Sequence, residues 1–203
     1  MCGMDGEMNM LQNIADTMLE KHEYDVVFQN VQIVNVYNDT IAKGEIGVIE
    51  GKIGEIAYNG KHLKAKRYID GKNAYALPGF IDSHMHLESS MLTPNHFAEI
   101  ALSCGTTTVA ADPHEIANVM GIKGVESLVE ACLNLPLNVF VFAPSTIPSL
   151  PGFETSGFDV TNKEMEEMLK LNGVIGLGEV MDFNAVSHGE KRMIDIIQAA
   201  SDK

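Results

Sequence analysis

The sequence predicts an α/β fold, with a small antiparallel β domain followed by the N-terminal half of a (β/α)8 TIM barrel. The barrel half is indicated by continuous apolar runs at residues 80–86, 107–111, 139–143 and 174–179. Such runs are typical of parallel strands covered on both faces, and their starts are separated by roughly the thirty residues that a strand, a helix and their loops occupy. A closed barrel has eight such units, so four units make half a barrel.

The chain before residue 78 has a different pattern. Residues 9–20 carry apolar side chains at helical spacing, which predicts an amphipathic helix with a structural role. Short β-branched runs follow, at residues 26–28, 31–34, 46–49 and 53–56. The segments 50–52 and 70–73 contain the glycine that tight hairpin turns need, so we expect hairpins there. We therefore expect a helical segment at residues 1–22, a β domain at residues 23–77 and four β/α units at residues 78–203.

The helices expected between the barrel strands have recognisable ends. Thr93 precedes Pro94, which suits the first turn of a helix, and Gly105 follows the last turn. Thr161 and Glu164 have the spacing of a capping box. These signals predict that helices begin directly after Thr93 and after Thr161.

Composition limits the partners and the compartment. The 203 residues carry a formal net charge of -14, which disfavours nucleic acid, because phosphate binding needs clustered Lys and Arg. The three cysteines are too scattered for a disulfide framework, which favours a reducing compartment. No apolar stretch approaches the ~20 residues that span a bilayer, and the N-terminus has no signal-peptide pattern. We expect a cytoplasmic protein that acts on a small molecule and has no membrane or nucleic-acid partner.

His84 and His86 end the first barrel run and are the most informative residues. Residues at i and i+2 of a strand share a face, so the two imidazoles can hold one metal ion. A divalent ion lowers the pKa of water from about 15.7 to near 7, so such a pair favours metal-assisted hydrolysis. Asp82 lies on the same face and is expected to orient an imidazole; a structural cap of the strand is the alternative. For the histidines themselves, the alternative is an ordinary pair at a strand end.

Glu179 follows the apolar run 174–178, where a carboxylate is costly to bury unless it is paired or binds metal. A metal-ligand role explains it, and a solvent-facing glutamate at a strand end is the alternative. The glycines at positions 176 and 178 allow neighbouring backbone to approach this segment closely.

Four more residues are candidates for catalysis. Asp112, His114 and Glu115 follow the second strand, at the barrel end where catalytic loops gather. A capped helix start, with Asp112 near the N-cap and Glu115 at N3, is the alternative. Glu88 continues from the histidine strand into its loop, where a carboxylate can move protons between water and a leaving amine. A solvated loop acid is its alternative.

These blocks carry a resemblance. Residues 78–86, Pro-Gly-Phe-Ile-Asp-Ser-His-Met-His, resemble the first barrel strand of the amidohydrolase superfamily. With residues 87–91, 112–119 and 176–181 added, the chain resembles the adenine deaminase family of bacteria and archaea over nearly its whole length from about Tyr24. The resemblance implies that His84 and His86 are metal ligands and that Glu179 bridges two metal ions. It also implies that the β domain is a composite β-sandwich completed by C-terminal strands, and that further histidine ligands and a catalytic aspartate lie beyond Lys203.

The activity implied by this resemblance is hydrolysis of adenine to hypoxanthine and ammonia, a reaction of purine salvage. The implied cofactor is a pair of divalent ions, with manganese favoured and iron or zinc also suited to the ligands. Two alternatives stay open: a cyclic amidohydrolase acting on a hydantoin or dihydroorotate, and an incomplete fragment without activity of its own. An unclosed half barrel exposes a strand edge, so we expect a homo-oligomer or completion by a C-terminal half.

Overall fold

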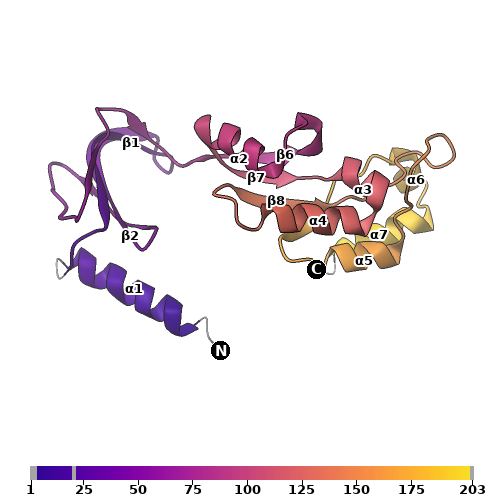
Figure 1. The fold of residues 1–203 in the computed structure, drawn as a ribbon, viewed down its shortest axis with the longest axis horizontal. Coiled ribbons are helices and arrows are strands. Elements are labelled where there is room, and N and C mark those ends of the chain that lie inside the picture. Colours follow the sequence, from indigo (N-terminus) through magenta and orange to yellow (C-terminus); the bar gives the residue numbers. More distant parts are fainter. Residues whose placement is uncertain (1–3, 20–21, 202–203) are drawn as a thin grey trace. The chain divides into compact units, whose positions relative to one another are not determined.

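A computed structural model describes residues 4–19 and 22–201 of the chain (Figure 1). The structure divides into two compact units, Met1–Pro78 and Gly79–Lys203. Each unit has its own sheet and its own buried cluster of apolar side chains.

The first unit is a helix and a five-stranded sheet. Its elements are α1 (Met4–Met18), β1 (Val26–Asn35), β2 (Thr40–Ile49), β3 (Lys52–Tyr58), β4 (Tyr68–Asp70) and β5 (Tyr75–Ala76). The strands β1, β2 and β3 pair antiparallel, as expected from their alternation with glycine turns. The turn between β2 and β3 is the expected hairpin, because Glu50 and Gly51 both have positive φ, 50° and 73°.

The two short strands of this sheet pair differently from the expectation. Both β4 and β5 lie parallel to β1, so the sheet is mixed and not purely antiparallel. The turn at residues 70–73 is therefore not a hairpin, and it joins two strands that both pair with β1. Its main chain is held by Gln29 and Asn30 of β1, whose carbonyls accept hydrogen bonds from Gly71 and Asn73. The prediction of a hairpin at residues 70–73 was wrong. A turn that contains glycine bends the chain locally, but it does not determine which strand the two flanking strands pair with.

Tyr24 is at the centre of the first unit's core. It packs with Val27, Ile49, Ala57 and Leu63, all buried. Of the apolar residues of α1, Ile14 packs against this cluster, whereas Leu11 and Met18 remain about half exposed, at 58% and 48%. Thr17 is also buried and Asn13 donates a hydrogen bond to Glu50, so the apolar part of this contact is narrower than the apolar spacing of the helix predicts.

The second unit has the four predicted parallel strands, β6 (Phe80–Met85), β7 (Thr106–Ala111), β8 (Asn138–Ala143) and β9 (Val174–Leu177). They pair in the order of the sequence. The connections contain η1 (Glu88–Ser90), α2 (Pro94–Ser103), α3 (His114–Met120), α4 (Ile122–Cys132) and α5 (Asn162–Met168), and α6 (Phe183–Ser187) and α7 (Lys191–Ser201) follow β9. This parallel, sequential order is that of consecutive β/α units.

Two helix starts agree with the sequence signals. Helix α2 begins at Pro94 after Thr93, and Gly105, at φ 89°, ends the turn that follows it. Helix α5 begins after Thr161, whose side chain and that of Glu164 form the predicted capping box. No helix in the described part of the chain is long and apolar enough to cross a membrane.

The helices cover one face of the parallel sheet. Contacts join α2 to β7, α4 to β8 and α7 to β9, and the main buried cluster lies beneath them. On the other side of the strands Phe140 is 43% exposed and Ile175 is 49% exposed. The sequence predicts strands that are covered on both faces. In the described part of the chain, helices cover one face of the sheet, and the other face is exposed at Phe140 and Ile175.

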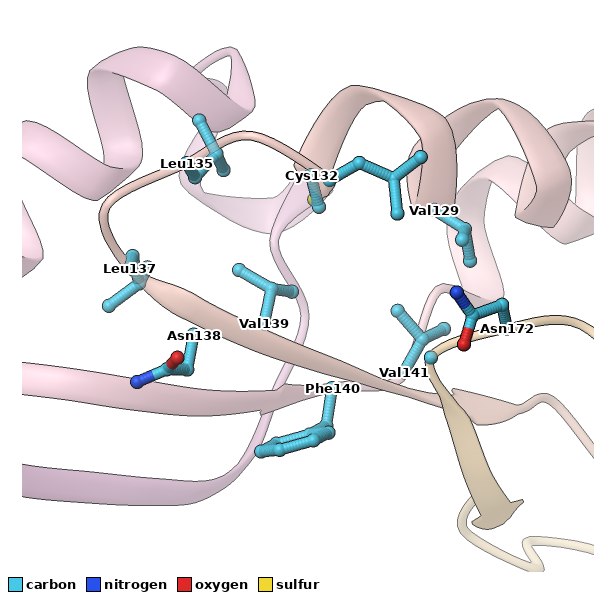
Figure 2. A pocket seen from close by; sticks show the side chains of 11 residues that line it. Val129, Cys132, Leu135, Leu137, Asn138, Val139, Phe140, Val141 and Asn172 are labelled. Carbon is cyan, nitrogen blue, oxygen red and sulfur yellow. The ribbon is translucent and has the colours of Figure 1, made fainter. Parts of the chain in front are cut away.

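A pocket of about 210 Å³ lies between α4, β8 and the two residues that precede β9, Asn172 and Gly173 (Figure 2). Val139 and Val141 project from β8 toward α4, and Phe140 projects to the opposite side of the strand. Cys132, whose thiol is free and buried, lines the pocket, and burial raises the pKa of this thiol to about 11. The pocket is at the amino ends of the strands and contains none of the candidate site residues.

Candidate metal centre

The predicted site residues gather at the carboxyl ends of the four parallel strands. His84 is near the end of β6, and His86 follows that strand directly. Asp112 follows β7 directly, and Glu179 follows β9 by two positions. Because parallel strands end at the same edge of their sheet, residues far apart in sequence meet there.

Three side chains converge on one position. Glu179 Oε2 lies 3.7 Å from His84 Nε2, and Glu179 Oε1 lies 3.3 Å from His86 Nε2. The two imidazole rings stand edge to face, with their centroids 5.2 Å apart. A ligand atom from each of the three residues lies within 4.8 Å of the others. Ligand atoms around one cation with bonds near 2.1 Å are separated by about 3 to 4 Å, so the donor set and spacing fit a divalent transition metal.

The ring of His86 is held through its other nitrogen. His86 Nδ1 lies 2.7 Å from the carbonyl oxygen of Asp112, so Nδ1–H donates and the Nε2 lone pair faces Glu179. Burial acts most strongly on the pKa of His86 and lowers it. The hydrogen bond to Asp112 and the carboxylates of Glu115, Asp112 and Glu179 together outweigh burial, so this pKa is raised overall. A ring fixed in this tautomer is prepared to bind a cation through Nε2.

The main chain of Glu179 is fixed at both its amide and its carbonyl. Its N–H donates to Asp112 Oδ2 at 2.7 Å, and its carbonyl accepts from Ser145 Oγ at 2.6 Å and from Thr146 Oγ1 at 3.4 Å. The side chains of all three partners are buried, with Asp112 and Ser145 completely so. Glu179 thus holds its carboxylate on a rigid support.

Ser145 and Thr146 were not identified from the sequence. They follow the apolar run of β8 as Asp112 follows that of β7, and this position was the available signal. Gly178 is approached closely by a side chain and not by the backbone that the sequence predicted: a Cβ there would lie 2.3 Å from Asp112 Oδ2. No atom lies within 4 Å of a Cβ built at Gly176, so the expected crowding applies to only one of the two glycines.

Asp112 and His114 lie beside this cluster. His114 Nδ1 lies 2.8 Å from Asp112 Oδ1 and 3.9 Å from Glu179 Oε1. Asp112 lies near the N-cap of α3, which is Pro113, and Glu115 lies in the first turn of this helix, as in the helix-start alternative. The carboxylate of Asp112 does not cap the helix, however, because it accepts the amide of Glu179 and belongs to the polar cluster.

Three further candidates lie at the edge of the cluster. Glu115 Oε2 lies 3.7 Å from His86 Nδ1 and its other oxygen accepts from Ser89. Glu88 accepts the amide of Ile116 at 3.1 Å, and burial raises the pKa of its carboxyl. Asp82 accepts the main-chain amide of His84 at 3.3 Å, so it contacts the backbone of this residue and not its imidazole.

Residues 75–203 match the model of the Amidohydrolase family. The chain belongs to this family. It is 43% identical over 198 residues to an adenine deaminase from Staphylothermus marinus. The matched region covers 93% of this chain and 32% of that relative. It is also 43% identical over 176 residues to an adenine deaminase from Klebsiella pneumoniae, covering 87% of this chain and 29% of that one. The chain thus spans about a third of the length of these curated relatives.

Solved structures give the same fold at low identity. A D-aminoacylase matches with a TM-score of 0.61 and 18% identity, over 87% of this chain and 43% of that one. An N-acyl-D-glutamate deacylase from Bordetella bronchiseptica, complexed with zinc, matches with a TM-score of 0.59 and 16% identity, over 89% and 44%. The α/β fold predicted from the sequence, part of an amidohydrolase barrel with a small sheet domain, is confirmed.

Proposed function

We propose that this chain carries the metal-binding part of an adenine deaminase, which hydrolyses adenine to hypoxanthine and ammonia in purine salvage. The observation that supports this most is the convergence of His84, His86 and Glu179 at the carboxyl edge of the sheet. The adenine deaminases that share 39% to 43% identity with most of this chain support the choice of substrate. The reaction adds one water and releases one ammonia, so it needs no redox partner.

In this proposal His84, His86 and Glu179 would hold a pair of divalent ions, with manganese favoured and iron or zinc also suited to the ligands. When bound, the ions would make a water more acidic and would stabilise negative charge that develops on the substrate. Asp112 orients the ring of His86 through its carbonyl and fixes Glu179 through its carboxylate. Because these ligands are already held in place, they need not rearrange when charge develops in the transition state. Such preorganised groups stabilise the transition state more than the bound substrate.

Glu115 is our candidate for moving protons. Its carboxylate is partly exposed, lies beside His86 and is held by Ser89, so it can reach a substrate that enters from solvent. The carboxylate of Glu88 is attached to the first turn of α3 through Ile116. We propose that Glu88 supports Glu115, one residue earlier in α3, and retain direct proton transfer by Glu88 as a prediction.

The exposed face of the parallel sheet is a candidate surface for contact with another part of the protein or with a second chain. Ile81 of β6 is 69% exposed, and Phe140 of β8 and Ile175 of β9 are 43% and 49% exposed. We propose that a further part of the longer protein, or a second chain, covers these side chains. Size-exclusion chromatography of residues 1–203 tests this: we expect large species, and a single monomeric peak would contradict it.

The decisive experiment replaces the matching segment of the Klebsiella pneumoniae adenine deaminase with this chain. Conversion of adenine to hypoxanthine is followed with manganese, iron and zinc. We expect activity that is lost in His84→Ala and in Glu179→Gln and kept in His96→Ala, since His96 is exposed on α2 and outside both clusters. No conversion of adenine by a folded graft, or hydrolysis of a hydantoin or dihydroorotate in its place, would contradict the proposal.

A further inference from the structure

The two histidines of the metal centre are held in different ways. His86 Nδ1 donates a hydrogen bond to the carbonyl oxygen of Asp112, 2.7 Å away. In the described part of the chain the ring of His84 makes no such bond, and its polar contact is with Glu179 Oε2, 3.7 Å from Nε2. Imidazoles that bind metal are almost always oriented by a partner of their second nitrogen. The orientation of His84 therefore depends on a contact of another kind.

The ring of Phe142 makes that contact. Its centroid lies 6.3 Å from the centroid of the His84 ring, and the two planes are inclined by 32°. Aromatic rings attract one another at centroid distances of about 4.5 to 7 Å. Phe142 is on β8 and His84 is on β6, with β7 between them, so their backbones are about 10 Å apart. The two rings thus meet over β7.

The pairing of the strands explains why Phe142 reaches His84. Phe140 projects to the side of β8 opposite α4 (Figure 2), and Phe142 shares that face because it is two residues further along the strand. The partner of Phe142 on β9 is Gly176. No atom of Phe142 or of another residue lies within 4 Å of a Cβ built at Gly176. The ring of Phe142 therefore leans away from β9 and toward β6.

We propose that Phe142 is a positioning residue of the metal centre, which orients the ring of His84 by packing, as the Asp112 carbonyl orients His86 by a hydrogen bond. Packing against a flat ring restricts rotation of the imidazole and keeps Nε2 directed toward Glu179. A leucine at position 142 has no flat face, so His84 would sample other orientations. The inference rests on the proposed function, because it takes His84 as a metal ligand.

Manganese affinity of the 203-residue chain, measured by calorimetric titration, tests this role. We expect Phe142→Leu to weaken binding about 10-fold, as loss of a group that orients a metal ligand does. Phe142→Tyr keeps the ring and should bind with nearly the affinity of the unmutated chain. Phe140→Leu is the matched control, because it makes the same change on the same face of β8 at a side chain that is 43% exposed. It should leave the affinity unchanged.

Urea denaturation of the metal-free variants separates positioning from a structural role. A residue that serves only the packing of the sheet would lower the stability of Phe142→Leu and leave its manganese affinity unchanged. That result would overturn the positioning role, as would equal losses of affinity in Phe142→Leu and Phe140→Leu.

Nuclear magnetic resonance of the metal-free chain gives a readout that needs no ion. The ring current of Phe142 shifts the resonances of the carbon-bound ring protons of His84, which the spectrum of His84→Ala identifies. We expect these resonances to move in Phe142→Leu and to stay in place in Phe140→Leu. Unchanged His84 resonances in Phe142→Leu would overturn the inference. If the unmutated chain binds no manganese, the proposed function is contradicted, and the resonances of His84 alone then decide whether Phe142 orients this ring.

Discussion

The amide of Glu179 donates a 2.7 Å hydrogen bond to Oδ2 of Asp112, a residue 67 positions earlier in the chain. The bond joins the segment after β9 to the segment after β7 and passes over β8, which lies between them in the sheet. The position of the candidate ligand Glu179 therefore depends on a loop that contributes no residue to the group of His84, His86 and Glu179.

Gly178 is required for this bond. In Gly178→Ala the new Cβ would lie 2.3 Å from Asp112 Oδ2, a distance that forces the carboxylate or the Glu179 segment to move. Because displacing groups that orient metal ligands typically weakens metal binding 10- to 100-fold, we expect a loss in roughly this range, measured by calorimetric titration with manganese. Gly176→Ala is the matched control, since its Cβ meets no atom within 4 Å, and equal affinities in the two variants would contradict the argument.

Ser145 supports the other end of the same residue. Ser145→Ala removes the 2.6 Å bond to the Glu179 carbonyl and leaves Thr146, at 3.4 Å, as a weaker donor. Loss of one buried hydrogen bond is expected to lower the free energy of unfolding by about 1 to 2 kcal/mol, which urea denaturation measures. Ser103→Ala, at an exposed serine that bonds its own helix, should change this free energy by less than about 0.5 kcal/mol. A larger loss in Ser103→Ala than in Ser145→Ala would count against a supporting role.

Tyr24 makes the first unit sensitive to alkaline pH. Burial and the hydrogen bond to Glu55 raise the pKa of this phenol to about 12, above its ordinary value of 10.0. The folded state therefore keeps the proton over a range in which the unfolded state loses it, so stability is full below pH 10 and declines as pH rises toward 12. Denaturant midpoints between pH 9 and about 11 should fall less in Tyr24→Phe than in the unmutated chain, and parallel declines would show that other groups cause the loss.

Helix α7 gives a matched test of the core beneath β9. Ile196 is completely buried, whereas Ile194, two residues away, is 45% exposed. We expect Ile196→Ala to lower the free energy of unfolding by about 2 to 5 kcal/mol, because it removes buried methylenes and leaves a cavity. Ile194→Ala should cost about 1 kcal/mol or less. Similar losses in the two variants, measured by urea denaturation, would mean that α7 does not pack as described.

The periodic features of the fold followed directly from the sequence. The four barrel strands, the starts of α2 and α5 and the hairpin at Glu50 and Gly51 depend on neighbours in the chain, and local patterns predict them. The parallel pairing of β4 and β5 with β1 was not predicted. It depends on the path of the chain between strands, which turn residues do not specify.

The site was predicted in part for the same reason. His84, His86 and Glu179 carry recognisable chemistry at strand ends, and the structure brings them together. The roles of Asp112, as an acceptor for Glu179, and of Ser145 were not predictable, because each hydrogen bond links segments that are adjacent only in the folded sheet. Long-range contacts of polar side chains leave no periodic signal in one sequence.

His86 follows β6 and Glu179 follows β9, the first and last strands of the parallel sheet, yet their side chains approach to 3.3 Å. Strands in a flat sheet are about 4.8 Å apart, so three intervals would separate these residues by roughly 14 Å. Curling of the sheet and the length of the two side chains close that distance. A cation bound by both residues would link the outermost strands of the sheet. Because it would bind the folded state, its binding energy would stabilise the entire second unit.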